Sequence, residues 1–232
     1  MMRVMCLPYA GAGAGLYRPW KGLADGRLQA VPLQLPGREE QFSQPFYSSF
    51  AEAVADIAGR AVEAARGEPF ALFGHSFGGL LAFEAARHLY DSGGPLPEHL
   101  VVSGARSPRQ RGYTGLSDDD EEAVASLKQD ARRGFEALDN PELRALLLPV
   151  IRADIRLLEQ YGDERNPVAD PLPIPVTVLR GAADSVATAE SSTDWKNFTS
   201  ADHTELEMPG GHLYLLDHMP ELWRVIEEQL CP

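Results

Sequence analysis

The feature that most constrains the fold is a short, wholly apolar run, residues 70–73, that leads directly into segment 74–78, Gly-His-Ser-Phe-Gly. A strand that is buried on both faces is apolar along its whole length. Glycines on both sides of a serine permit the sharp turn from such a strand into a helix, and this turn exposes the serine at the edge of a sheet. The segment therefore predicts a nucleophile elbow with Ser76 as the nucleophile.

The Gly-x-Ser-x-Gly pattern alone is weak evidence, because a shuffled chain of this composition contains it roughly a tenth of the time. The alternatives are a glycine-rich turn without chemistry and a phosphate-binding loop. A phosphate-binding loop carries a lysine before its serine or threonine, and segment 74–79 has no lysine. The apolar strand before the serine and the helical pattern after it favour the elbow.

Short β-type runs alternate with longer helix-type runs along most of the chain. This alternation is typical of an α/β fold with a mainly parallel sheet covered by helices. We expect a single domain of the α/β-hydrolase fold, with a mostly parallel central sheet flanked by helices. Besides the strand at 70–73, the runs that predict strands are residues 4–7, 30–35, 99–103, 176–179 and 204–208.

The alternation stops between Ser107 and Pro175. This stretch predicts one helix capped near Ser117, whose first turn is acidic, as the helix dipole favours. A second helix is expected over residues 140–162, where leucine and isoleucine are frequent. We interpret residues 107–175 as a helical insertion between two strands, not as a separate domain.

Composition excludes several classes of protein. The 232 residues include 34 acidic and 21 basic side chains, and a net charge of −13 argues against nucleic acid as a partner. No apolar segment reaches 18 residues, and the apolar run at the N-terminus is too short for a secretory signal. The two cysteines are far apart, outside any metal-binding or redox spacing. We therefore expect a cytoplasmic protein without cofactor, metal or membrane contact.

A serine hydroxyl needs a neighbouring base, and in this fold the chain order is serine, acid, histidine. Of the six histidines, only His212 follows directly on a glycine-containing loop, segment 209–211, just after the last predicted strand. The carboxyl ends of parallel strands meet at one edge of a sheet, so this position lies at the same edge as Ser76. His212 is the predicted base, and His218 is the second choice.

The acid that orients the base is expected at the end of the preceding strand. Asp184 lies just past the strand predicted at 176–179, after Gly-Ala-Ala. Asp170 comes too early in the chain, while Asp194 and Asp202 lie in or after a helical stretch. Aspartates in such loops are often only turn formers, but Asp184 is the best choice.

Acyl chemistry also needs donors for the oxyanion. In an elbow of this kind, one donor is the backbone amide of the residue after the nucleophile, here Phe77. The other comes from a loop after an early strand, and segment 8–11 is the obvious candidate, with the Ala10 amide as the donor. The simpler interpretation is that the glycines of this loop only turn the chain.

Several segments carry a resemblance to a known family that runs nearly end to end. The chain resembles the stand-alone type II thioesterases that accompany polyketide synthases and nonribosomal peptide synthetases. The matching segments are 7–11 (Leu-Pro-Tyr-Ala-Gly), 35–39 (Leu-Pro-Gly-Arg-Glu), 74–78, 147–154 (Leu-Leu-Pro-Val-Ile-Arg-Ala-Asp) and 211–212 (Gly-His). Segments 35–39 and 147–154 are much more specific than the serine motif.

The resemblance implies an editing enzyme that removes stalled or aberrant acyl groups from the phosphopantetheine arm of acyl carrier or peptidyl carrier proteins. It also implies that the insertion is a mobile lid over the acyl channel. The chain departs from the family at Phe77, where methionine is frequent, and at Tyr9, where histidine is frequent. Segment 128–138 carries two arginines in place of a glycine-containing apolar stretch, so the acyl preference stays open.

Two other functions remain open. One is an oxygen-ester hydrolase or a chain-releasing thioesterase on the same fold, which would use the same three residues. The other is a non-catalytic binding member of the fold.

A partner prediction follows from charge. Because carrier proteins of these systems are acidic, as the resemblance implies, docking on a chain of net charge −13 needs a local basic or apolar patch. Arg106, Arg109 and Arg111 are the first candidates for a phosphate-binding patch, and Arg132 and Arg133 are the second. The alternative is that these arginines only offset nearby acidic residues.

Overall fold

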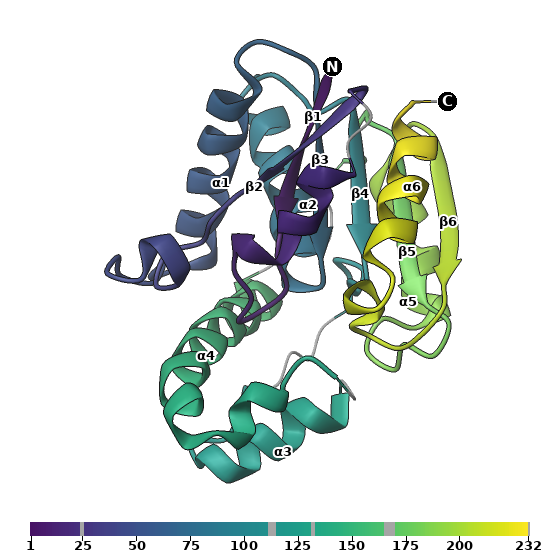
Figure 1. Cartoon of the computed structure of the whole chain (residues 1–232). Helices are drawn as coiled ribbons and strands as arrows, with labels where there is room; N and C mark the ends of the chain where they lie inside the picture. The colour runs from purple at the N-terminus through teal and green to yellow at the C-terminus, as the bar shows by residue number, and fades with distance from the viewer. Residues whose placement is uncertain (24–25, 111–114, 131–132, 165–169, 232) are drawn as a thin grey trace.

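The computed structural model describes residues 1–23, 26–110, 115–130, 133–164 and 170–231. Within them, six strands form one sheet in the order β2-β1-β3-β4-β5-β6, and all neighbours are parallel. All carboxyl ends therefore lie at one edge (Figure 1). The strands are β1 (Met2–Leu7), β2 (Leu28–Pro32), β3 (Phe70–His75), β4 (His99–Ser103), β5 (Val176–Gly181) and β6 (His203–Met208).

Helices cover both faces of this sheet. α1 (Phe50–Ala65) and α2 (Phe77–Asp91) pack on one face, and α6 (Met219–Leu230) packs on the other together with the 3-10 helix η1 (Ala14–Gly22). Alternate residues of β1 enter the two cores, since Met5 belongs to the first and Cys6 to the second. The predicted parallel sheet flanked by helices is confirmed. The shorter elements are η2 (Glu39–Gln41), α5 (Ala189–Asp194), η4 (Trp195–Phe198) and η5 (Tyr214–Leu216).

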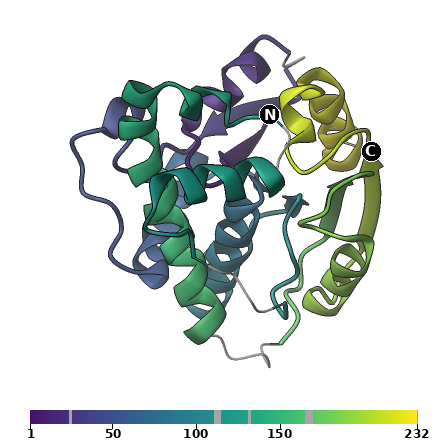
Figure 2. The same cartoon turned by 90° about the horizontal axis from the view of Figure 1, so that it is seen from below.

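The chain leaves the sheet after β4 and returns at β5, and the residues between form α3 (Asp120–Asp130), η3 (Glu136–Asp139) and α4 (Pro141–Glu164). Figures 1 and 2 show α3 and α4 beyond the carboxyl ends of the strands. The first half of α4 shares a small apolar cluster with α3, which includes Leu127 and Leu148. The second half packs on the main core, where the Tyr161 ring lies 4.6 Å from that of Phe50.

Two details differ from the sequence-based expectation. β2 ends at Pro32 instead of Leu35, because its pairing with β1 stops at Cys6. β2 is an edge strand, where a proline is tolerated. The cap of α3 is Asp119, whose carboxylate accepts from the amides of Glu121 and Glu122 at 3.0 Å.

Ser117, the residue near which the cap was expected, lies before Asp119 in the chain, and its hydroxyl accepts a hydrogen bond from the Asp119 amide.

Among the described residues, no helix is long and apolar enough to cross a membrane.

Candidate active site

Ser76 lies at the sharp turn between β3 and α2. Its backbone has φ 54° and ψ −115°, a conformation that costs energy for any residue with a side chain. The turn is held by the Ser76 amide, which donates to the Ser103 carbonyl at the end of β4 over 2.8 Å. This strained strand-to-helix turn has the geometry of a nucleophile elbow.

Glycine is required on both sides of this turn. A Cβ atom at Gly74 would lie 2.0 Å from the Gly78 carbonyl oxygen, and one at Gly78 would lie 2.3 Å from that of Leu7. Both distances are far inside van der Waals contact. The glycines therefore allow the elbow to close on itself and to lie directly against the end of β1.

A chain of hydrogen bonds leads from Ser76 to a buried carboxylate. The Ser76 Oγ atom lies 3.1 Å from His212 Nε2, and His212 Nδ1 lies 3.0 Å from Asp184 Oδ2 and 3.2 Å from Oδ1. The Asp184 side chain is fully buried, while that of His212 is 10% exposed. The structure thus brings together the three residues predicted from positions 76, 184 and 212.

The loops after β5 and β6 meet because glycine lines their contact. A Cβ atom at Gly181 would lie 2.4 Å from the Gly211 carbonyl oxygen. The amide of Ala183 donates to the Gly210 carbonyl at 2.8 Å, which joins the two loops just before the acid and the base. This contact places Asp184 behind the imidazole of His212.

Asp184 is kept ionised by its surroundings. Burial alone would raise its pKa, but the hydrogen bond and charge of His212 and the amides of Ala187 and Val186 outweigh burial and hold the pKa below its usual value. These two amides donate to Oδ1 at 2.9 and 2.8 Å. An anion fixed in this way can hold the Nδ1–H tautomer of His212, which leaves Nε2 free to accept the proton of Ser76.

Behind His212 lies a buried polar group that the sequence analysis did not identify. His75 Nδ1 lies 2.7 Å from Ser103 Oγ, which lies 2.6 Å from the Tyr214 hydroxyl. Burial, and then the charge of His212, lower the pKa of His75 to about 3, so its ring is neutral near pH 7. Its ring centroid is 5.4 Å from that of His212. His75 therefore packs beside His212 without competing for its proton.

The predicted oxyanion donors lie on the two segments that Gly78 brings together. Phe77 is the first residue of α2, and Ala10 follows β1 in the loop that begins at Pro8. Within the described part of the chain, neither amide donates a hydrogen bond to a protein acceptor. Both are therefore available to an oxygen atom of a ligand.

Other histidines and aspartates of the chain bond to residues outside this site. His218, the second choice for the base, bonds to Glu221 at 2.8 Å, and another of the six histidines, His99, bonds to Thr177 at 2.8 Å. Asp194 accepts from Ser107 and Asn197 near α5. No group of three or more potential metal ligands occurs among the residues described.

The arginines predicted to form a basic patch do not form a cluster of free cations among the described residues. Arg106 donates to the Val186 carbonyl, and Arg111 lies outside the described residues. Arg109 is half exposed, pairs with Asp194 at 3.5 Å and lies over the Phe198 ring.

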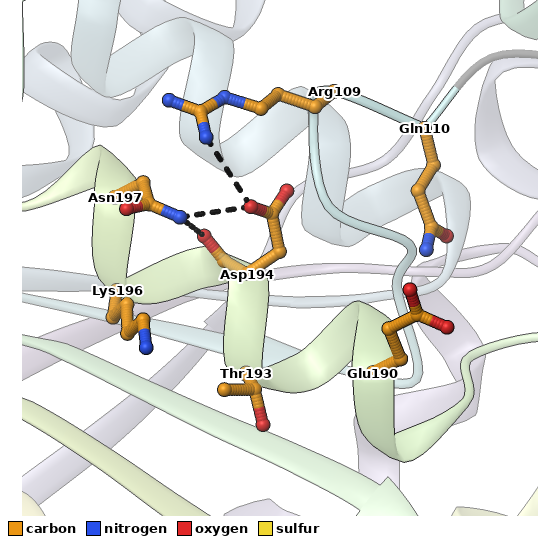
Figure 3. A pocket seen from close by; sticks show the side chains of 7 residues that line it. All are labelled: Arg109, Gln110, Glu190, Thr193, Asp194, Lys196 and Asn197. Carbon is orange, nitrogen blue, oxygen red and sulfur yellow. Dashed lines mark hydrogen bonds and ion pairs between the residues drawn. The ribbon is translucent and has the colours of Figure 1, made fainter.

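A cavity of about 570 Å³ adjoins Arg109, and its lining mixes acids with Lys196 (Figure 3). Arg109 is therefore not a free cation. Of the second pair, Arg132 lies outside the described residues and Arg133 pairs with Asp217.

Comparison with known proteins identifies the family to which the chain is similar. The thioesterase domain family matches residues 2–230. Thioesterase PikA5 of Streptomyces venezuelae is 32% identical over 99% of this chain and 81% of its own length.

Among the solved structures that are similar along nearly the whole chain are two from biosynthetic pathways. ClbQ from the colibactin NRPS/PKS pathway has a TM-score of 0.90 at 27% identity, covering 99% of this chain and 96% of its own. The type II thioesterase BorB from the borrelidin biosynthetic cluster has 0.82 at 32% identity, covering 98% and 92%.

The resemblance to type II thioesterases is thus confirmed, and the fold is of the α/β-hydrolase type. The chain belongs to the thioesterase domain family and is a thioester hydrolase.

Proposed function

We propose that this enzyme hydrolyses acyl thioesters through Ser76, with His212 as general base and Asp184 as the residue that orients it. The observation that carries this proposal is the 3.1 Å separation of Ser76 Oγ from His212 Nε2, with the buried Asp184 carboxylate on the opposite nitrogen. A nucleophile, a base and an orienting anion in hydrogen-bond contact are what acyl transfer to a serine needs.

The reaction proceeds in two halves. Ser76 Oγ attacks the thioester carbonyl carbon while His212 Nε2 takes its proton, and the resulting oxyanion accepts hydrogen bonds from the Ala10 and Phe77 amides. The carbon–sulfur bond then breaks, and the departing thiolate takes the proton from His212 and leaves as a thiol. Water next attacks the acyl-serine with the same base, which releases a carboxylic acid and restores Ser76.

The proposed substrate is an acyl group on the phosphopantetheine arm of an acyl or peptidyl carrier protein. Similarity to BorB, a type II thioesterase from the borrelidin biosynthetic cluster, supports this substrate, as does similarity to ClbQ from the colibactin NRPS/PKS pathway. The role would be removal of stalled or aberrant acyl chains. Cys6 and Cys231 are free thiols, which agrees with a reducing compartment such as the cytoplasm.

We further propose that the insertion at about 107–175 is a lid over the acyl-binding channel of a single domain. It has its own small apolar cluster, separate from the two cores of the sheet. Leu143 and Leu146 of α4 are 43% and 53% exposed, so α4 presents apolar side chains to solvent as well as to the core.

The decisive test is a hydrolysis panel. One carrier protein is loaded with acyl groups of different length, and the enzyme is compared on these thioesters and on oxygen esters of the same acids. The proposal predicts a strong preference for the carrier-bound thioesters, and labelling of Ser76 by a fluorophosphonate. A preference for oxygen esters would indicate a carboxylesterase, cyclised products a chain-releasing enzyme, and an unlabelled Ser76 a non-catalytic member of the fold.

A further inference from the structure

A buried ion pair joins the loop after β2 to helix α4. Arg38 Nη1 lies 2.6 Å from Asp154 Oδ2, and Arg38 Nη2 lies 2.7 Å from Oδ1. The two side chains are 6% and 3% exposed. Two parallel hydrogen bonds between a planar guanidinium and a carboxylate fix the orientation of both groups.

The same pair also forms hydrogen bonds with the glycine-rich loop after β1. Asp154 Oδ2 accepts from the Gly11 amide at 2.7 Å, and Arg38 Nη1 donates to the Ala12 carbonyl at 3.2 Å. One backbone donor and one backbone acceptor of adjacent residues are thus bound by two partners that are themselves locked together. The loop at residues 11–12 cannot rotate without breaking this arrangement.

Helix α4 also packs directly on this loop. Gly11 has φ +85°, which favours glycine, and a Cβ atom there would lie 2.3 Å from Ile151 Cγ1. Ile151 and Asp154 are one helical turn apart in α4, so one face of the helix supplies both the packing and the hydrogen-bond acceptor.

Gly11 follows Ala10 directly, and the Asp154 carboxylate holds the peptide group that joins them. The other end of the loop is held by Gly78, which lies against the Leu7 and Pro8 carbonyls. The Ala10 amide is therefore fixed from both sides, by the elbow on one and by the ion pair on the other.

We propose that Arg38 and Asp154 are positioning residues that aim the Ala10 amide at the oxyanion, so that seating of α4 on the loop completes the oxyanion hole. This inference rests on the proposed function in taking Ser76 and Ala10 as parts of the reaction site. A pair that only stabilised the fold would have no reason to affect the transition state more than substrate binding.

The test replaces both charges together, in Arg38→Met/Asp154→Leu. Apolar residues of similar volume in place of a buried ion pair leave no unpaired charge behind. The stability cost that remains comes from the Gly11 amide and the Ala12 carbonyl, which lose their partners. Hydrolysis is measured with a small acyl thioester without a carrier. Two affinities are measured as well. One is for an alkyl boronic acid, whose boron replaces the carbonyl carbon and forms a tetrahedral adduct on the serine, and the other is for an unreactive thioether analogue of the substrate.

We expect kcat and boronic acid affinity to fall together by about 10²-fold, the loss typical of one misplaced oxyanion donor. KM and thioether affinity are expected to stay within about twofold. Arg60→Met, which breaks the ion pair of Arg60 with Asp56 on α1, is the matched control and should leave all four values unchanged.

A folded double variant whose kcat and boronic acid affinity stay within about threefold of wild type would overturn the inference. So would a loss confined to KM and thioether affinity. If the double variant does not fold, Arg38→Lys is tested instead, because lysine keeps the positive charge but cannot make the two parallel hydrogen bonds to Asp154. A parallel fall of kcat and boronic acid affinity at constant KM then supports the inference, and unchanged values refute it.

The two proposals fail in different ways. A wild-type protein that cleaves neither acyl thioesters nor oxygen esters and is not labelled at Ser76 by a fluorophosphonate would overturn the proposed function, and the inference with it. An active wild type with an equally active double variant would overturn the inference alone. Preference for oxygen esters would change the substrate class and leave the inference standing.

Discussion

The contact between the elbow and the end of β1 gives a sharp test through Gly78. In Gly78→Ala, the new methyl group would lie 2.3 Å from the Leu7 carbonyl oxygen and 2.5 Å from that of Pro8. Both neighbours are backbone atoms, so no side chain can rotate away. The elbow and the loop after β1 must therefore move apart.

The size of this displacement follows from the distances. Ordinary van der Waals contact begins near 3.4 Å, so the two segments must separate by about 1 Å. Such a shift would separate the Ala10 amide from that of Phe77, and a misplacement of about 1 Å costs about 10²-fold in rate. This loss corresponds to about 2.7 kcal/mol of transition-state stabilisation. Overpacking of this kind also costs about 1–3 kcal/mol of folding stability.

The assay is steady-state hydrolysis of a small acyl thioester, together with thermal unfolding. Gly59→Ala is the matched control, because Gly59 is exposed in α1 and a Cβ atom there would meet nothing within 4 Å. The control should keep wild-type kcat and gain about 0.5–1 kcal/mol of stability, since alanine is favoured over glycine in a helix.

Wild-type kcat in folded Gly78→Ala would refute the reasoning, because the oxyanion hole would then tolerate a displaced loop. A loss of kcat in Gly59→Ala of similar size would also refute it, since the effect would not depend on the contact with β1.

Three further predictions concern the acid, pH and the lid. Asp184→Asn should lower kcat by about 10⁴-fold by favouring the wrong tautomer of His212; near-normal turnover in steady-state kinetics would disprove the assignment. Burial lowers the pKa of His75 to about 3 and that of His99 to about 4, so the unfolded chain binds more protons below pH ~6.5. The free energy of unfolding should thus fall as pH drops from ~6.5, by about 2 kcal/mol for each of the two histidines at pH 5, which urea titrations can measure. His75→Gln should remove the part of this fall that comes from His75, and a wild type whose unfolding free energy does not change with pH would contradict the prediction. Leu147→Phe should change the acyl-length preference on carrier-bound substrates while Tm stays near that of wild type. An equal loss of activity on all acyl groups together with a lower Tm would instead favour simple packing.

Much of the fold and of the active site could be predicted from the sequence, because the elements that form them are short segments with a recognisable local pattern and a fixed order along the chain. The strand at 70–73, the glycines around Ser76 and the loop before His212 each carry their own signal, and parallel pairing brings their ends together. Asp184 follows from the same logic, as the acid after the preceding strand.

The Arg38–Asp154 pair was not predictable, although both residues lie in the recognised segments. Its partners are 116 residues apart, and no local pattern links them. The same holds for Arg109, which the sequence places near the acids at 118–120 but whose partner in the structure is Asp194. Contacts between distant loops depend on tertiary packing, which single-chain patterns do not encode.

The most direct test of the account is deacylation of a carrier protein followed by intact-protein mass spectrometry. Wild-type enzyme and Ser76→Ala are each incubated with an acyl-phosphopantetheine carrier, after thermal unfolding has shown that both are folded. The account predicts that wild type removes the acyl mass and leaves the phosphopantetheine arm, while Ser76→Ala is slower by about 10⁴-fold or more. Deacylation by Ser76→Ala at even a tenth of the wild-type rate would show that Ser76 is not the nucleophile.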